Sequence, residues 1–183
     1  MAKLLVPISN GFEEIETTSI IDICRRANIE VVIASIEGIE VSGAHQITIK
    51  ADNLLSNIDD NEFDMIALPG GLPNAFNLAE NELLKNILKK FKKDNKNIAA
   101  ICAAPYALHK ADVLNQNYTC YPGFETKIKE SGYTQDENIV IDGKILTSRG
   151  PATAMAFALE IVKILKGKEE MEIVKEGILA NNC

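Results

Sequence analysis

The stretch NIAAICAAPYALHK, residues 97–110, predicts a buried strand that passes directly into a helix. Residues 97–101 form a short apolar run, which is typical of a strand covered on both faces. The residues after Cys102, to about Lys110, favour a helix. A strand followed at once by a helix is the building unit of a parallel sheet, and the rest of the chain repeats this unit.

Short apolar runs and longer amphipathic runs alternate along nearly the whole chain. The expected strands cover residues 3–8, 30–36, 64–68 and 97–101, and the expected helices cover residues 12–27, 80–93, 103–110, 151–165 and 169–175. Two hairpins are expected, one around Gly43 and one around Asp142-Gly143. Residues 118–133 show a mixed pattern. We therefore expect an α/β fold with a mostly parallel sheet, helices on both faces and functional residues at the carboxyl ends of the strands.

The length and the net charge of the chain limit the kinds of protein that it can be. At 183 residues the chain is expected to form a single domain spanning residues 1–183. Its formal net charge of −7 argues against a nucleic-acid partner, which needs a basic face. The longest nearly apolar run, residues 98–108, contains Pro105 and is too short to cross a bilayer. With no secretory pattern at the N-terminus, we expect a cytoplasmic protein without a membrane partner.

The cysteines do not predict a disulfide framework or a structural metal site. The chain has four cysteines and two histidines, and no two cysteines have the spacing of a Cys-x-x-Cys pair. Small disulfide scaffolds and zinc sites place their ligands closer together and in pairs. We expect neither a metal nor another cofactor.

Cys102 is the first candidate for chemistry. A thiol at a junction of strand and helix lies on a sharp turn, as in a nucleophile elbow, which requires a positive φ. The start of the following helix favours a thiolate, and the N–H of Ala103 can point at an oxyanion. The turn Pro69-Gly70-Gly71 also ends a strand, and glycines there let backbone N–H groups approach a ligand. The alternatives are a small buried cysteine and an ordinary turn.

Glu16 is the second candidate. It lies one turn before Ile20, Ile23 and Ala27 on the expected buried face of the first helix. A carboxyl that points into the protein has a raised pKa and can hold a proton, which it can donate to a thiolate. The alternative is a glutamate in the first turn that only complements the helix dipole, a role that suits Glu13 and Glu14.

Four motifs together resemble a known family. They are GFEEIET at residues 11–17, LPGG at 68–71, AAICA at 99–103 and LTSRGP at 146–151. In this order and spacing they are similar to the ThiJ/PfpI superfamily, in the branch of the Parkinson-disease-associated protein deglycase and its bacterial relatives. The resemblance covers nearly the whole chain. It implies a flavodoxin-like sandwich and a homodimer.

The resemblance also implies roles for individual residues. It places a nucleophilic, oxidation-sensitive cysteine at Cys102 and its protonated carboxyl partner at Glu16. It places the backbone donors for an oxyanion at Gly71 and Ala103. Two arginines bind an anion near the cysteine in related proteins. Arg26 matches one of them, and His45 stands at the position of the other, which comes from the partner subunit, so that His45 is expected to reach the site only across the dimer.

The chain departs from the family pattern at two positions. Many relatives have a histidine in a Thr-x-His-Pro stretch near the cysteine, and Tyr121 stands in its place here. A tyrosine is a poor base at neutral pH, although it can donate a hydrogen bond. His109 lies roughly 10 Å along the helix from Cys102 and is expected to be a surface or otherwise satisfied histidine. The peptidase branch has a histidine directly after the cysteine, where this chain has Ala103, so peptidase activity is not expected.

Two functions use these same residues. The first is a cofactor-free enzyme of glyoxalase or deglycase type, in which Cys102 adds to a small reactive carbonyl such as methylglyoxal to give a thiohemiacetal and then a hydroxy acid. The second is a non-enzymatic redox sensor or stress chaperone, in which Cys102 is oxidised to a sulfinate. In both, Cys102 is the most reactive of the four thiols, and Cys120 faces away from the site.

Overall fold

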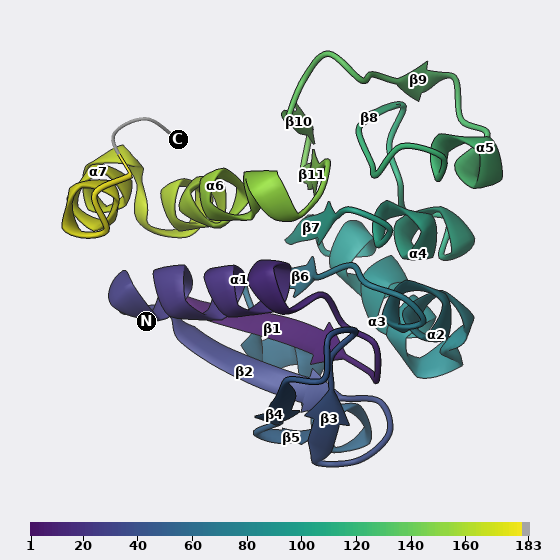
Figure 1. Ribbon diagram of the computed structural model, residues 1–183, viewed down its shortest axis with the longest axis horizontal. Coiled ribbons are helices and arrows are strands. Elements are labelled where there is room, and N and C mark those ends of the chain that lie inside the picture. The colour runs from purple at the N-terminus through teal and green to yellow at the C-terminus, as the bar shows by residue number, and fades with distance from the viewer. Residues whose placement is uncertain (181–183) are drawn as a thin grey trace.

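The computed structural model describes residues 1–180, and its centre is a seven-stranded sheet (Figure 1). The strand order is β10-β11-β7-β6-β1-β2-β5. All neighbours pair in parallel except β10 and β11, which form an antiparallel hairpin. The predicted mostly parallel sheet is confirmed. The strands are β1 (Lys3–Ile8), β2 (Glu30–Ser35), β5 (Asn53–Leu54), β6 (Met65–Leu68), β7 (Asn97–Ile101), β10 (Ile139–Asp142) and β11 (Ile145–Ser148).

Helices cover both faces of this sheet, as predicted. One face carries α1 (Glu14–Arg26), α6 (Ala154–Lys166) and α7 (Lys168–Gly177), and the other carries α3 (Glu82–Lys93) and α4 (Pro105–Lys110), with α2 (Asn74–Glu80) beside them (Figure 1). Within residues 1–180, no helix combines the length and the apolar character that crossing a membrane requires.

The sequence of β1 shows why two helical layers are needed. Leu4 and Val6 point into the core shared with α1 and α6, whereas Leu5 points into the core shared with α3 and α4. All three side chains are fully buried. Because successive side chains of a strand point to opposite faces, a strand that is apolar at every position requires cover on both sides.

Smaller elements lie outside the sheet. The predicted hairpin around Gly43 is confirmed as β3 (Glu40–Ser42) paired with β4 (Thr48–Lys50). The stretch with a mixed pattern contains a parallel pair, β8 (Asn117–Tyr118) and β9 (Gly132–Tyr133), with α5 (Glu125–Ile128) between them in the chain.

Some element boundaries differ from the sequence-based expectation. The helix predicted from residue 80 begins at Glu82, because Asn81 caps it by accepting the N–H of Leu84 at 2.9 Å. The separate helix α2 before it was not predicted. The first helix begins at Glu14, because the Glu13 side chain accepts the N–H of Glu16 at 2.7 Å as its cap. The helix predicted from residue 151 begins with a 3-10 turn before α6.

The topology brings three chain segments to one edge of the sheet. β7 lies between β6 and β11, with Leu68 opposite Ala100 and Ser148 opposite Ile101. The residues that follow these strands therefore leave the sheet side by side. They are the Gly70-Gly71 turn, Cys102 and Arg149.

Candidate active site

Cys102 has the backbone conformation of an elbow. It follows β7 directly and has a φ of 64°, which confirms the predicted positive value. A side chain rarely adopts this conformation unless its surroundings hold it. Here its N–H donates to the carbonyl of Ser148 at 2.9 Å, and its own carbonyl accepts the N–H of Tyr121 at 2.8 Å. The neighbouring chain segments thus hold Cys102 from both sides.

The two glycines of the turn after β6 are required by close contacts. A Cβ on Gly70 would lie 2.7 Å from the Cβ of Cys102 and 2.9 Å from Oε2 of Glu16. Gly71 has a φ of 87°, and a Cβ there would lie 2.3 Å from the backbone nitrogen of Glu13. Without side chains, the turn lies directly against the thiol, and the N–H of Gly71 donates to the sulfur together with the N–H of Ala103.

Glu16 is fully buried next to this thiol. Its Oε2 accepts the N–H of Gly70 at 2.7 Å, whereas Oε1 has no hydrogen-bond partner of normal geometry within residues 1–180. Burial raises the pKa of the carboxyl to about 7, although the N–H of Gly70 and the Cys102 thiol act to lower it. An ionised Glu16 would leave a buried, half-satisfied charge, so the protonated form is favoured below pH 7 and remains well populated near neutral pH.

The thiol and the carboxyl titrate as a pair. Burial, and next the negative charge of Glu16, raise the pKa of the Cys102 thiol, while the N–H groups of Gly71 and Ala103 lower it. The predicted activation of the thiol by the start of a helix is therefore outweighed while Glu16 is ionised. The repulsion disappears when Glu16 holds the proton, because a neutral carboxyl can donate to the sulfur. Near neutral pH the pair thus resists losing both protons and shares one.

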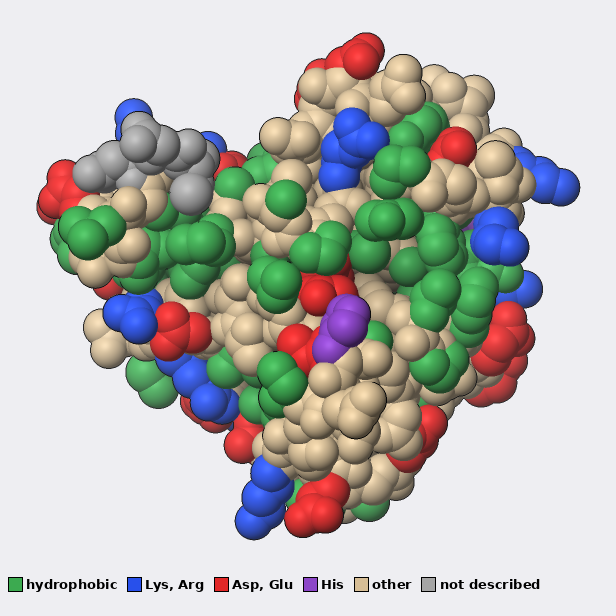
Figure 2. Space-filling view, in the orientation of Figure 1, with side chains coloured by type: hydrophobic (Ala, Val, Ile, Leu, Met, Phe, Trp, Pro, Cys, Tyr) green, Lys and Arg blue, Asp and Glu red, His purple; other side chains and the backbone are tan. Residues whose placement is uncertain are grey.

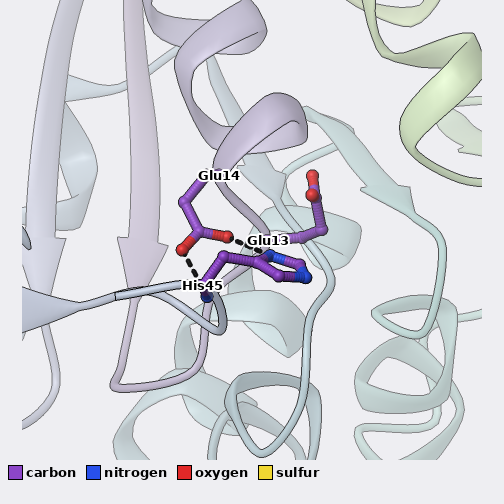
Figure 3. A group of neighbouring side chains, drawn as sticks. All are labelled: Glu13, Glu14 and His45. Atoms are coloured by element: carbon purple, nitrogen blue, oxygen red, sulfur yellow. Dashed lines mark hydrogen bonds and ion pairs between the residues drawn. The ribbon is translucent and has the colours of Figure 1, made fainter. Parts of the chain in front are cut away.

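A second cluster lies at the same end of α1 and contains Glu13, Glu14 and His45 (Figure 3). The Glu14 carboxylate is buried and accepts the backbone N–H of His45 at 2.6 Å, and its Oε2 lies 2.9 Å from His45 Nδ1. Burial acts to raise the pKa of Glu14, yet the hydrogen bonds from the ring and backbone of His45 outweigh it and lower the pKa. The same hydrogen bond raises the pKa of His45. Figure 2 shows acidic side chains beside a histidine on this face, bordered by hydrophobic side chains.

His45 lies at the N-terminal end of α1 in its own chain, where it bonds to Glu14. That it reaches the site of a partner subunit across a dimer stays a prediction. The loop that carries it is fixed to the start of α1 by two backbone hydrogen bonds, from Ala44 to Phe12 at 2.9 Å and from Gly11 to Ser42 at 2.7 Å.

Arg26 does not join this end of the helix within one chain. It lies ten residues after Glu16, which is roughly 15 Å along the helix axis. Its side chain pairs with Asp22 at 2.6 Å. One chain therefore brings together Cys102, Glu16 and the backbone donors at positions 71 and 103, but it does not bring Arg26 to them.

Tyr121 follows the buried Cys120 and has an exposed side chain. Its ring lies over Gly150, where a Cβ would be 3.2 Å from Cδ2 of the tyrosine. The ring lines a cavity of about 260 Å³, together with Pro122, Asn138, Arg149 and residues 150–153. The expectation that residues 120 and 121 face opposite ways is confirmed.

The surroundings of the remaining cysteines and of His109 suit a structural role rather than a catalytic one. Cys24 and Cys120 are completely buried, and burial raises the pKa of each to about 12. Cys183 lies outside the described residues. His109 is partly exposed and pairs with Glu130 at 3.3 Å, in agreement with the expected surface or satisfied histidine.

Arg149 was not among the sequence candidates, although it lines the cavity beside Tyr121. Gly70 belonged to a candidate turn, and the structure shows that it provides the close approach between Glu16 and Cys102. Both residues follow the end of a strand within a motif, so the sequence contained a signal for Arg149 as well. Strand order, which the sequence did not reveal, decides that those ends meet.

Comparison with known proteins agrees with this geometry. A model of the DJ-1/PfpI family matches residues 2–164. Protein DJ-1 homolog B of Arabidopsis thaliana is 41% identical over 171 residues, which are 92% of this chain and 39% of the plant protein. The chain thus spans less than half the length of that relative. A Caenorhabditis elegans protein named glutathione-independent glyoxalase DJR-1.2 is 35% identical over 92% of this chain and 90% of its own length.

The fold agrees equally well with a solved structure. The crystal structure of Drosophila melanogaster DJ-1beta superposes with a TM-score of 0.94 at 36% identity, and the alignment covers 97% of both chains. The predicted flavodoxin-like fold is therefore confirmed, and the family match extends over most of the chain. From its sequence and its fold together, we conclude that the chain belongs to the DJ-1/PfpI family.

Proposed function

We propose that this protein is a cofactor-independent enzyme of glyoxalase or deglycase type that converts a small reactive carbonyl, such as methylglyoxal, into a hydroxy acid. The observation that carries the proposal is the convergence of one buried carboxyl and two backbone N–H groups on the sulfur of Cys102. The name of the Caenorhabditis elegans relative supports the same class of reaction.

In the first step, the Cys102 thiolate attacks the aldehyde carbon of methylglyoxal. A carbon–sulfur bond forms, and the electron pair of the C=O double bond moves to the oxygen. The N–H groups of Gly71 and Ala103 stabilise this oxyanion, and Glu16 protonates it to give a thiohemiacetal. A carboxyl with a pKa of about 7 suits this role, because it can give up and regain a proton near neutral pH.

In the second step, the Glu16 carboxylate removes the proton from the former aldehyde carbon and returns it to the neighbouring carbon, while the hydroxyl proton passes from the first oxygen to the former ketone oxygen. The thiohemiacetal thereby becomes a 2-hydroxy thioester, with no change in overall oxidation state. Water then cleaves the thioester, which releases the hydroxy acid and regenerates Cys102. The reaction consumes one water molecule and needs no external oxidant or reductant.

Tyr121 stands where many relatives have a histidine, and its ring is exposed while its backbone N–H donates to the carbonyl of Cys102. We assign it a hydrogen-bond donor role toward the substrate rather than a role as base. Arg26 and His45 complete the residues that the resemblance connects with substrate or anion binding. Because His45 is charged only when protonated and its Nδ1 lies 2.9 Å from Glu14, we expect its contribution to be smaller than that of an arginine.

The test is conversion of methylglyoxal to lactate without glutathione by the wild type and by Cys102→Ala. We expect a loss of at least ~100-fold in kcat/KM for this variant. Cys120→Ala is the matched control, because it also removes a buried thiol, and it should keep activity if it folds. Full activity of Cys102→Ala, or no turnover by the wild type, would overturn the proposal.

A second candidate function is redox sensing by Cys102, and the same donor arrangement favours it. The N–H groups at positions 71 and 103 and a protonated Glu16 would bind the oxygens of a sulfinate. Peroxide treatment followed by mass spectrometry would then find two added oxygen atoms on Cys102, in a protein that does not turn over methylglyoxal.

We also propose a homodimer in which Arg26 of one subunit approaches the site of the other. Arg26 lines a cavity of about 550 Å³ at the far end of α1, together with Met155 and residues 177–179. Sedimentation at micromolar concentration should give the mass of a dimer. A monomer under these conditions would exclude this arrangement.

A further inference from the structure

Arg149 differs from the other two arginines of the chain. Arg25 pairs with Asp52 at 3.5 Å, and Arg26 pairs with Asp22 at 2.6 Å. Within residues 1–180, Arg149 forms no ion pair with any carboxylate, although acidic residues outnumber basic ones by 26 to 19. In so acidic a chain, the unpaired guanidinium is therefore a feature that needs an explanation.

The guanidinium is held in place, but most of its hydrogen-bonding capacity is unused. Arg149 is partly buried, and its Nη1 donates to the backbone carbonyl of Gln135. This is the one hydrogen bond that its side chain makes to residues 1–180. Because a guanidinium carries five N–H donors in a rigid plane, donors remain for a planar anion.

These donors lie at a shallow hollow that is open to solvent. The cavity of about 260 Å³ is lined by Arg149 together with Tyr121, Asn138 and the two prolines at positions 122 and 151. The arginine, the tyrosine and the asparagine provide polar groups, and the prolines provide an apolar wall. A few polar groups in a mainly apolar hollow are typical of a small-molecule subsite.

The segments that line the cavity are connected to the nucleophile through the backbone. Cys102 donates its N–H to Ser148, the residue before Arg149, at 2.9 Å, and accepts the N–H of Tyr121 at 2.8 Å. Tyr121, which lines the cavity, and Ser148, which precedes the lining residue Arg149, are thus both bonded to the backbone of Cys102. The parallel pairing of β7 and β11, which lie side by side, creates this arrangement (Figure 1).

The groups that face Arg149 leave its charge available. Burial raises the pKa values of Cys120 and Tyr133, and the charge of Arg149 acts to lower both. Glu125 acts on the same two groups in the opposite direction, but it forms no ion pair with Arg149 and accepts the N–H of Gly123 at 2.6 Å instead. The cavity therefore keeps a positive charge in a chain that is negative overall.

We propose that the cavity between Tyr121 and Arg149 binds the carboxylate of an anionic substrate, namely a 2-oxo aldehyde whose far end carries a carboxylate. The proposal rests on the proposed function, because the aldehyde reacts at Cys102 while the carboxylate lies on Arg149. A guanidinium binds a carboxylate through two parallel hydrogen bonds, and the Tyr121 hydroxyl can add a third. This carboxylate subsite at residues 121 and 149 is separate from the anion site that the resemblance connects with residues 26 and 45.

The test compares two substrates with the same reacting carbons. One is methylglyoxal, and the other is 4,5-dioxopentanoate, in which a carboxyethyl group replaces the methyl group. In Arg149→Gln we expect KM for 4,5-dioxopentanoate to rise roughly tenfold to a hundredfold, with methylglyoxal changed less than about twofold. Arg149→Lys keeps the charge but cannot donate two parallel hydrogen bonds to a carboxylate. Its KM for 4,5-dioxopentanoate should therefore lie between those of the wild type and Arg149→Gln. Arg25→Gln, which removes a surface arginine, should change neither substrate.

Two outcomes would overturn the proposal. Equal losses for both substrates in Arg149→Gln, with unchanged thermal unfolding, would mean that Arg149 only supports the segment around Tyr121. No change for either substrate would mean that the cavity does not take the carboxylate.

Failure of the proposed function would look different, because the wild type would then turn over neither substrate. In that case calorimetry with 4-oxopentanoate, which has the carboxylate but no aldehyde, still tests the cavity. Binding to Cys102→Ala that is lost in the double variant with Arg149→Gln supports the subsite. Equal binding, or none, contradicts it.

Discussion

Glu14 and Glu16 lie two residues apart at the start of α1, and both are buried, yet their pKa values move in opposite directions. Burial acts to raise the pKa in both cases. Glu14 accepts hydrogen bonds from the ring and the backbone of His45, and these outweigh burial. Glu16 accepts one N–H, from Gly70, and keeps an oxygen without a partner of normal geometry within residues 1–180. Glu14 accepts more hydrogen bonds and Glu16 lies deeper in the protein, and both differences favour a charge on Glu14 and a proton on Glu16.

This difference separates two roles on one turn of helix. Glu14 is a charged anchor that holds the loop of residues 42–47 against the helix. Glu16 is a carboxyl that can hold its proton, because its surroundings do not satisfy a full negative charge. The arrangement explains how a helix start, which favours negative charge, can also present a neutral carboxyl to a thiol.

The largest expected effect concerns the pH dependence of stability. The pKa of Glu16 is raised from 4.5 to about 7, so the folded state binds its proton more tightly than the unfolded state does. The contribution of Glu16 is complete below pH 4.5 and falls as the pH rises to 7, by about 3 kcal/mol. Glu16→Gln cannot lose a proton and should lack this slope. Urea unfolding at pH 5 and pH 8 measures it.

The control for this experiment is Glu40→Gln, which changes an exposed carboxyl. It should show the same pH dependence as the wild type. If Glu16→Gln kept the wild-type slope between pH 5 and pH 8, Glu16 would already be ionised at low pH, and the contrast with Glu14 would fail.

A smaller loss of stability is expected for Glu14→Gln. The amide can accept only one of the two hydrogen bonds from His45, so one hydrogen bond is lost, at a cost of about 1 kcal/mol at pH 7. Because the folded pKa of Glu14 is lowered, its contribution is present above pH 4.5 and disappears as the pH falls through the folded pKa. The difference in the free energy of unfolding between the variant and the wild type, measured with urea, should therefore disappear at acidic pH. A difference that stays constant would contradict the charged state of Glu14.

The sequence predicted the sheet and the elbow because both depend on local patterns. Runs such as residues 97–101 show strands, and a strand that enters a helix places Cys102 on a turn. The raised pKa of Glu16 was anticipated from its position on the buried face of the helix. The raised pKa of Cys102 was not anticipated, because it depends on burial and on the charge of Glu16 together.

Contacts between distant segments could not be predicted in this way. His45 lies in a loop whose position depends on hydrogen bonds to residues 11 and 12 across the chain. The cavity at Arg149 depends on which strand lies beside β7. The sequence shows that strands exist, whereas their order follows from packing of the whole domain.

The smallest effect expected is on the selectivity of oxidation. Limited peroxide should oxidise Cys102 before Cys24 and Cys120, because it is 7% exposed and the other two are fully buried. The experiment uses a Cys183→Ser background, and mass spectrometry locates the added oxygen. Glu14→Gln should leave this order unchanged, since Glu14 bonds to His45 rather than to the sulfur. Oxidation of Cys120 first would count against the site at Cys102.

The most direct test of the central claim is the pH dependence of alkylation by iodoacetamide in the wild type, Glu16→Leu and Glu16→Gln, with Glu14→Gln as the control. The claim is that Glu16 holds the shared proton near neutral pH and donates it to the Cys102 thiolate. Removing this donor in Glu16→Leu should raise the apparent thiol pKa and slow alkylation at pH 7, while Glu16→Gln, which retains an N–H donor, should lie between. A lowered or unchanged pKa in Glu16→Leu would show that Glu16 acts on the thiol as a charge, and would contradict the account.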